Sequence, residues 1–209
     1  MCSNLLKGQI LLSKVKVSRQ PYFKYDIETR AHDTITFYLS EFNQQIKLPL
    51  IIFVQGSGNN SLFTKDSIGI TANYGHINLP YISKDKAKVL IVEKPGVGFL
   101  MGDRNGLTAN KKFNERFALQ TWTATIEVAI KYVIKYENID STKILIVGHF
   151  EGGIVAAKIA HELKPLITHI ATLAGEGPSQ LYCYIPLPGP ANSLIINYTI
   201  KQKRSGQIP

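Results

Sequence analysis

The sequence predicts an α/β fold, in which a mostly parallel β-sheet is flanked by helices. Short apolar runs that end at glycine or proline recur along the chain, as expected of strands buried on both faces. Amphipathic helical segments separate the later runs, and this alternation is typical of a parallel sheet covered on both sides. With 209 residues, of which 44% are hydrophobic and 19% charged, the chain can form one sizeable globular domain.

The expected strands fall into an opening group and a buried group. The turn-forming residues 30–33 separate two β-compatible runs, so we expect an antiparallel hairpin near the start of the domain. The later runs are continuous and apolar, which favours strands in the middle of the sheet. In chain order the expected strands are residues 11–17, 22–29, 34–40, 48–54, 89–92, 144–147 and 167–173.

Two helices are expected among the buried strands. The first begins at Asn114, which can cap it, and runs to about Glu137, because apolar residues recur at three- and four-residue spacing from Ala118 onward. The second follows residues 148–150 and ends before Pro165, since proline cannot continue a helix.

The composition changes near residue 178. Residues 178–209 contain half of the chain's 10 prolines and no aspartate, glutamate or histidine. Residues 193–200 read as a strand, but no helix precedes them. We therefore predict two parts, an α/β domain over residues 1–177 and an atypical proline-rich tail over residues 178–209.

Charge, cysteine content and hydropathy limit the classes of partner and cofactor that we expect. The net charge of +9 raises nucleic acid as a partner class, but the basic residues are scattered and no nucleic-acid-binding motif is present, so we do not expect such binding. Cys2 and Cys183 lie at opposite ends without metal-ligand spacing, and no metal or cofactor is expected. The chain shows neither a signal peptide nor a run long enough for a membrane span, which predicts a cytoplasmic protein without membrane contact.

A sharp turn between a strand and a helix is encoded after residue 147. Glycine is expected on both sides of such a turn, because strand and helix approach too closely there for side chains. The turn resembles the nucleophile elbow of α/β hydrolases, where G-x-S-x-G holds a serine in a strained conformation. With serine at position 150 the turn would be similar to the G-H-S-E-G-G elbow of peptidase- and esterase-like members. The residues that carry this resemblance are Gly148, His149, Phe150, Glu151, Gly152 and Gly153.

Two further loops fall in the order of that family. Residues 55–58, which follow the strand 48–54, resemble its oxyanion loop, and residues 93–98 resemble the loop after its fourth strand. The resemblance covers residues 20–177 and implies an α/β-hydrolase-type sheet that is incomplete after the sixth family strand. It also implies that the backbone N–H groups of Ser57 and Glu151 are the oxyanion-hole donors.

The side chains that this family uses for catalysis are missing. Its members need an oxygen nucleophile, then an acid, then a histidine in chain order. Phe150 occupies the nucleophile position and has no lone pair with which to attack. Glu176 is a candidate relic acid, but no histidine follows it, since His161 and His169 both precede it. The resemblance therefore implies a truncated, catalytically inactive chain, whereas intact relatives act on small ester or peptide substrates.

Other roles remain open beside simple loss of activity. A binding or scaffolding pseudoenzyme can use the pocket under Phe150, or the free sheet edge at residues 167–173 for self-association. The catalytic alternatives are Ser57 as a replacement nucleophile and His149 as a base. We expect Ser57 to be an ordinary turn residue and His149 to pack locally.

Several polar residues are interpreted as ordinary surface groups. His32 and His76 fall in expected loops and are predicted to be exposed. Glu93 and Lys94 follow a buried strand and are predicted to be a solvated pair near the mouth of the site.

Overall fold

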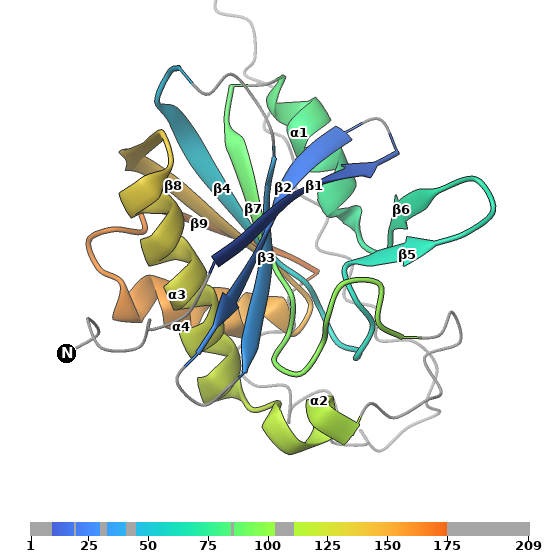
Figure 1. Ribbon diagram of the computed structural model, residues 1–209. Coiled ribbons are helices and arrows are strands. Elements are labelled where there is room, and N and C mark those ends of the chain that lie inside the picture. The colour runs from blue at the N-terminus through green and yellow to red at the C-terminus, as the bar shows by residue number, and fades with distance from the viewer. Residues whose placement is uncertain are drawn as a thin grey trace, which may run out of the picture. The chain divides into compact units, whose positions relative to one another are not determined.

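The computed structural model describes residues 10–18, 20–29, 33–40, 45–84, 86–102 and 111–174, all within one compact unit, residues 1–176. The proline-rich tail and Glu176 lie outside the described residues. Within them, a seven-stranded mixed sheet has the order β1-β2-β3-β7-β4-β8-β9 (Figure 1). The strands are β1 (Ile10–Val17), β2 (Gln20–Glu28), β3 (Thr34–Ser40), β4 (Leu48–Val54), β7 (Lys88–Val92), β8 (Ile139–His149) and β9 (His169–Leu173).

The sheet has an antiparallel half and a parallel half, and the predicted fold class is confirmed. Strands β1, β2, β3 and β7 pair antiparallel, whereas β7, β4, β8 and β9 run parallel. The predicted hairpin between β2 and β3 is present, with Glu28 opposite Thr34. In the parallel half, the carboxyl ends of the strands meet at one edge, where the loops after β4, β7 and β8 lie.

Each face of the sheet packs on a separate apolar layer. The helices α3 (Leu119–Tyr136) and α4 (Gly152–Glu162) cover one face (Figure 1). Trp122 and Ile126 pack there against alternate strand residues such as Ile52 and Ile146. The opposite face packs on a smaller group of elements, namely β5 (Phe63–Lys65), β6 (Ile70–Ala72), η1 (Gly75–Ile77) and α1 (Asn78–Ser83).

The long helix predicted from Asn114 is two helices. Asn114 lies inside α2 (Lys111–Arg116), which ends before α3 begins. Ala118 between them has an extended backbone (φ −149°, ψ 156°), and its N–H donates to Thr121 Oγ1 at 3.0 Å. The hydrogen bond between Ala118 and Thr121 therefore caps the start of α3, whereas the sequence predicted Asn114 as the capping residue. The predicted end near Glu137 is confirmed.

Strand β9 is the last element of the sheet in the described part of the chain. It begins two residues later than predicted, because Thr168 instead bonds to Ile144, with its N–H 3.0 Å from the carbonyl oxygen. Most side chains of β9 are exposed. Among the described helices, none combines the length and apolar character needed to cross a membrane.

Candidate functional site

The turn between β8 and α4 has the backbone of a strained elbow. Phe150 adopts φ 50°, in the left-handed region that bulky residues rarely occupy. Its N–H donates to Leu173 O on β9 at 3.1 Å, and its carbonyl accepts from Gly153 N–H at 2.8 Å. The phenyl ring is 47% exposed. Phe150 is therefore presented outward at the carboxyl edge of the sheet, where a nucleophile would stand.

Two glycines allow the strand and the helix to approach this closely. A β-carbon on Gly148 would lie 2.3 Å from the carbonyl oxygen of Gly152. A β-carbon on Gly152 would lie 2.4 Å from Val54 O at the end of β4. Real β-carbons do not approach backbone atoms at these distances, so the elbow requires glycine at both positions.

The loop after β4 lies against the elbow. A β-carbon on Gly56 would be 3.0 Å from Cβ of Phe150 and 3.5 Å from Nδ1 of His149. Ser57 follows it and is exposed. In the part of the chain that the structure describes, the N–H groups of Ser57 and Glu151 donate to no other group. Both can therefore donate to an acceptor on a bound molecule.

The described histidines at and after the elbow do not form a catalytic arrangement with it. The ring of His149 packs edge-on against Phe150, with centroids 4.4 Å apart. His161 lies in the last turn of α4, at the opposite end of that helix from Phe150. His169 pairs with Leu145 at the start of β9, whereas the elbow follows the end of β8.

Glu93 is buried, and the prediction of a solvated residue is wrong. Its side chain is 1% exposed. Oε1 accepts from Tyr38 OH at 3.0 Å and from Ser61 Oγ at 2.6 Å, and Leu62 N–H donates to Oε2 at 3.0 Å. Burial raises the pKa of this carboxyl to about 8, although its hydrogen bonds act in the opposite direction. Glu93 directly follows β7, and its partners from β3 and from the loop after β4 enclose its carboxyl group.

Lys94 is buried as well and points the other way. Its Nζ donates to Gly58 O at 3.0 Å and lies 3.4 Å from Glu151 Oε2. The same atom lies 4.2 Å from the ring centroid of Trp122 and 4.9 Å from that of Phe117. Burial lowers the pKa of Lys94 to about 8, partly opposed by Glu151. Lys94 thus connects the loop after β4 to Glu151, the residue that follows Phe150. In the sequence, only the position of residue 94 at the carboxyl edge of the sheet could have suggested this role.

Solved structures share this architecture. An acetyl xylan esterase from Thermoanaerobacterium sp. is 15% identical, with a TM-score of 0.54 over 80% of this chain and 53% of its own. An esterase from an Arctic intertidal metagenomic library is 12% identical, with a TM-score of 0.55 over 77% and 63%. A methylesterase is 14% identical, with a TM-score of 0.55 over 80% and 35%. The chain has an α/β-hydrolase fold.

The likeness concerns the fold and covers only part of each neighbour. The chain spans 53% and 63% of the two esterases, so each has a large segment that this match does not include. No protein-family model and no curated protein sequence matches the chain.

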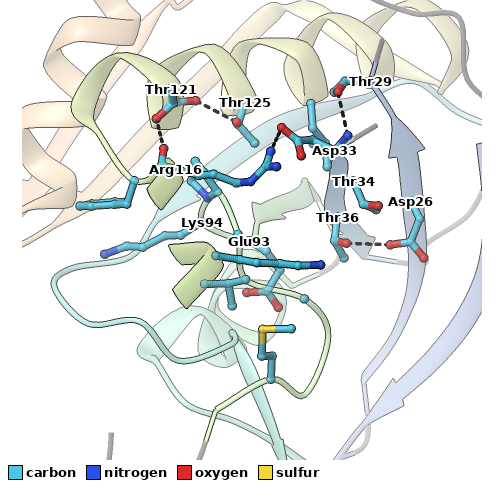
Figure 2. A pocket seen from close by; sticks show the side chains of 18 of the residues that line it. Asp26, Thr29, Asp33, Thr34, Thr36, Glu93, Lys94, Arg116, Thr121 and Thr125 are labelled. Carbon is cyan, nitrogen blue, oxygen red and sulfur yellow. Dashed lines mark hydrogen bonds and ion pairs between the residues drawn. The ribbon is translucent and has the colours of Figure 1, made fainter. Parts of the chain in front are cut away.

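One cavity in the described part of the chain is lined in part by Glu93 and Lys94. Its volume is about 1050 Å³, and it lies between the β2–β3 hairpin, the loop after β7, and the helices α2 and α3 (Figure 2). Phe150 is not among the residues that line it, and the pocket expected under that residue stays a prediction. Charged side chains in it pair with one another: Arg116 pairs with Asp33, and Lys24 pairs with Asp26. Asp26 also accepts from Thr36 Oγ1 at 2.7 Å.

Glycine at position 150 should make the α/β-hydrolase elbow more stable than alanine does. Both substitutions remove the ring, but only alanine keeps a β-carbon at φ 50°. We expect the Phe150→Gly variant to exceed Phe150→Ala by about 1 kcal/mol in free energy of unfolding, measured in urea. Equal stabilities would show that the left-handed conformation of residue 150 is not maintained in solution.

Proposed function

We propose that this chain is a catalytically inactive relative of the esterases and peptidases that share its fold. The observation that carries the proposal is Phe150 at the left-handed position of the elbow. A phenyl group offers neither an attacking lone pair nor a proton, so no acyl-enzyme can form there. Loss of the serine alone lowers turnover on the order of a millionfold in a well-studied serine hydrolase.

The missing base supports the same conclusion. Among the described residues, His149 packs on the ring of Phe150, while His161 and His169 lie at the far ends of α4 and β9. The N–H groups of Ser57 and Glu151 remain as oxyanion-type donors. Such donors stabilise a transition state only where a nucleophile generates one.

The purified chain should not turn over p-nitrophenyl acetate above the buffer rate and should not react with a fluorophosphonate probe. An active serine esterase assayed in parallel shows that both reagents work. The matched variant is Ser57→Ala, because Ser57 is exposed and follows Gly56, which lies against the elbow. Labelling of the wild type that disappears in Ser57→Ala would overturn the proposal and identify a replacement nucleophile.

A binding role through self-association is the second candidate, and the exposure of β9 favours it. Ile170 and Leu173 are each 48% exposed, and in the described part of the chain β9 pairs only with β8. The strand also carries no lysine or proline, the residues that usually protect a sheet edge from pairing. A second copy of this chain is the occupant that we propose for that edge.

Sedimentation at increasing concentration tests this association. We expect a dimer in the wild type and a monomer in the Ile170→Lys variant, because a charged side chain disfavours edge pairing. Ile68→Lys is the matched control, since Ile68 is 92% exposed and lies between β5 and β6. A monomeric wild type, or a dimer that survives Ile170→Lys, would exclude this edge as the interface.

A further inference from the structure

Glu93 joins three segments that are distant in sequence. Its carboxyl accepts from Tyr38 OH on β3, from Ser61 Oγ and from Leu62 N–H in the loop after β4. Its side chain is buried at the end of β7. One carboxyl group therefore connects β3, the loop after β4 and the loop after β7.

The same network fixes one wall of the cavity. Residues 97–102, here named the wall loop, follow Glu93, and several of them line the cavity together with Glu93 (Figure 2). Leu100 N–H donates to Ser61 Oγ at 3.1 Å, and Ser61 N–H donates to Met101 O at 2.9 Å. Because Ser61 also donates to Glu93, the position of the wall loop depends on the carboxyl group.

No cation contacts this carboxyl within the described residues. Lys94 turns toward Glu151, and Lys24 on β2 pairs with Asp26. An ionised Glu93 is thus a buried negative charge without a positive partner, which costs several kcal/mol unless the group moves into water. Tyr38 and Tyr74 interact electrostatically with Glu93, and neither they nor the buried His76 supplies a positive charge at neutral pH. Lys88 is the first residue of β7, at the opposite end of that strand from Glu93.

We propose that Glu93 is a proton-linked latch: its neutral carboxyl keeps the wall loop closed, and its ionisation releases the loop and opens the cavity. The raised pKa, about 8, agrees with this direction. A solvated carboxyl in the open state ionises near its ordinary value, so the closed state binds the proton more tightly. The bound proton therefore favours closure fully below about pH 4.5, and this contribution is lost progressively as the pH rises to about 8.

Amide hydrogen exchange at Leu62 and Leu100 reports the latch, because both N–H groups donate into the network. After correction for the intrinsic exchange rate, we expect their protection in the wild type to fall about tenfold per pH unit between roughly pH 5 and 8 and to level off above about pH 8. The Glu93→Gln variant keeps a neutral hydrogen-bonding group and should show no such fall. Amides of the buried helix α3, such as Val133, should stay protected in both proteins.

Two controls make the result decisive. Lys94→Met removes the other nearby group whose pKa is about 8, and it should leave the loss of protection between about pH 5 and 8 unchanged. If Glu93→Gln does not fold, the infrared band of a protonated carboxyl in the wild type should be present near pH 7 and absent near pH 9. An unchanged loss of protection in Glu93→Gln, or no carboxyl band at neutral pH, would overturn the latch. The device concerns the cavity and not the elbow, so it does not depend on whether the chain hydrolyses esters.

Discussion

Replacing Gly148 by alanine should leave little folded protein. The new β-carbon would lie 2.3 Å from Gly152 O and 2.6 Å from Gly153 Cα, and both are backbone atoms. Relief requires β8 and α4 to separate, which would also disturb the hydrogen bond between Phe150 and Leu173. We expect the free energy of unfolding to fall by about 3 kcal/mol or more, measured by urea denaturation or as loss of soluble protein.

Gly75→Ala is the matched control for this substitution. A β-carbon there meets no atom within 4 Å, and Gly75 begins the short helix η1. Its stability should stay within about 0.5 kcal/mol of the wild type. If Gly148→Ala were equally well tolerated, the close packing of strand and helix at the elbow would be wrong.

The parallel half of the fold could be predicted because its strands carry a strong signal. Residues 48–54 and 89–92 are continuous apolar runs, and such runs are stable only where both faces of a strand are covered. The elbow was equally readable, since close backbone approach leaves glycine as the residue that fits at positions 148 and 152. These features depend on local sequence and on backbone geometry alone.

The burial of polar residues could not be predicted in the same way. Glu93 and Lys94 stand in a loop, and a loop position normally indicates exposure. They are buried because partners from β3, the loop after β4 and α3 converge on them, and these segments are far apart in sequence. The division between α2 and α3 was missed for a similar reason, because the extended backbone of Ala118 leaves no mark in the apolar spacing.

His76 is another polar residue whose burial could not be predicted, and its burial affects the free energy of unfolding. It was predicted to be a surface residue, but its ring is fully buried against Phe53 and Phe63. Neither ring nitrogen has a hydrogen-bond partner in the described part of the chain. Burial lowers the pKa of His76 to about 3, because the imidazolium would lie in an apolar layer without a counter-charge.

The wild type should lose stability in acid through this histidine. The unfolded chain takes up the proton near the ordinary histidine value of 6.5, whereas the folded chain does so near 3, so the unfolded state binds more protons in between. The contribution is fully present above about pH 6.5 and lost as the pH falls toward 3. It amounts to on the order of 5 kcal/mol.

Urea denaturation of the wild type and of His76→Leu at several pH values isolates the contribution of His76 to the free energy of unfolding. The two curves of unfolding free energy against pH should diverge below about pH 6.5, with the variant falling less steeply, because leucine occupies the apolar layer without a proton to gain. His161→Gln should follow the wild type, since His161 is exposed on α4. Parallel curves for the wild type and His76→Leu would mean that the imidazole is reached by water, and the layer formed by β5, β6 and η1 would then be far looser than its packing indicates.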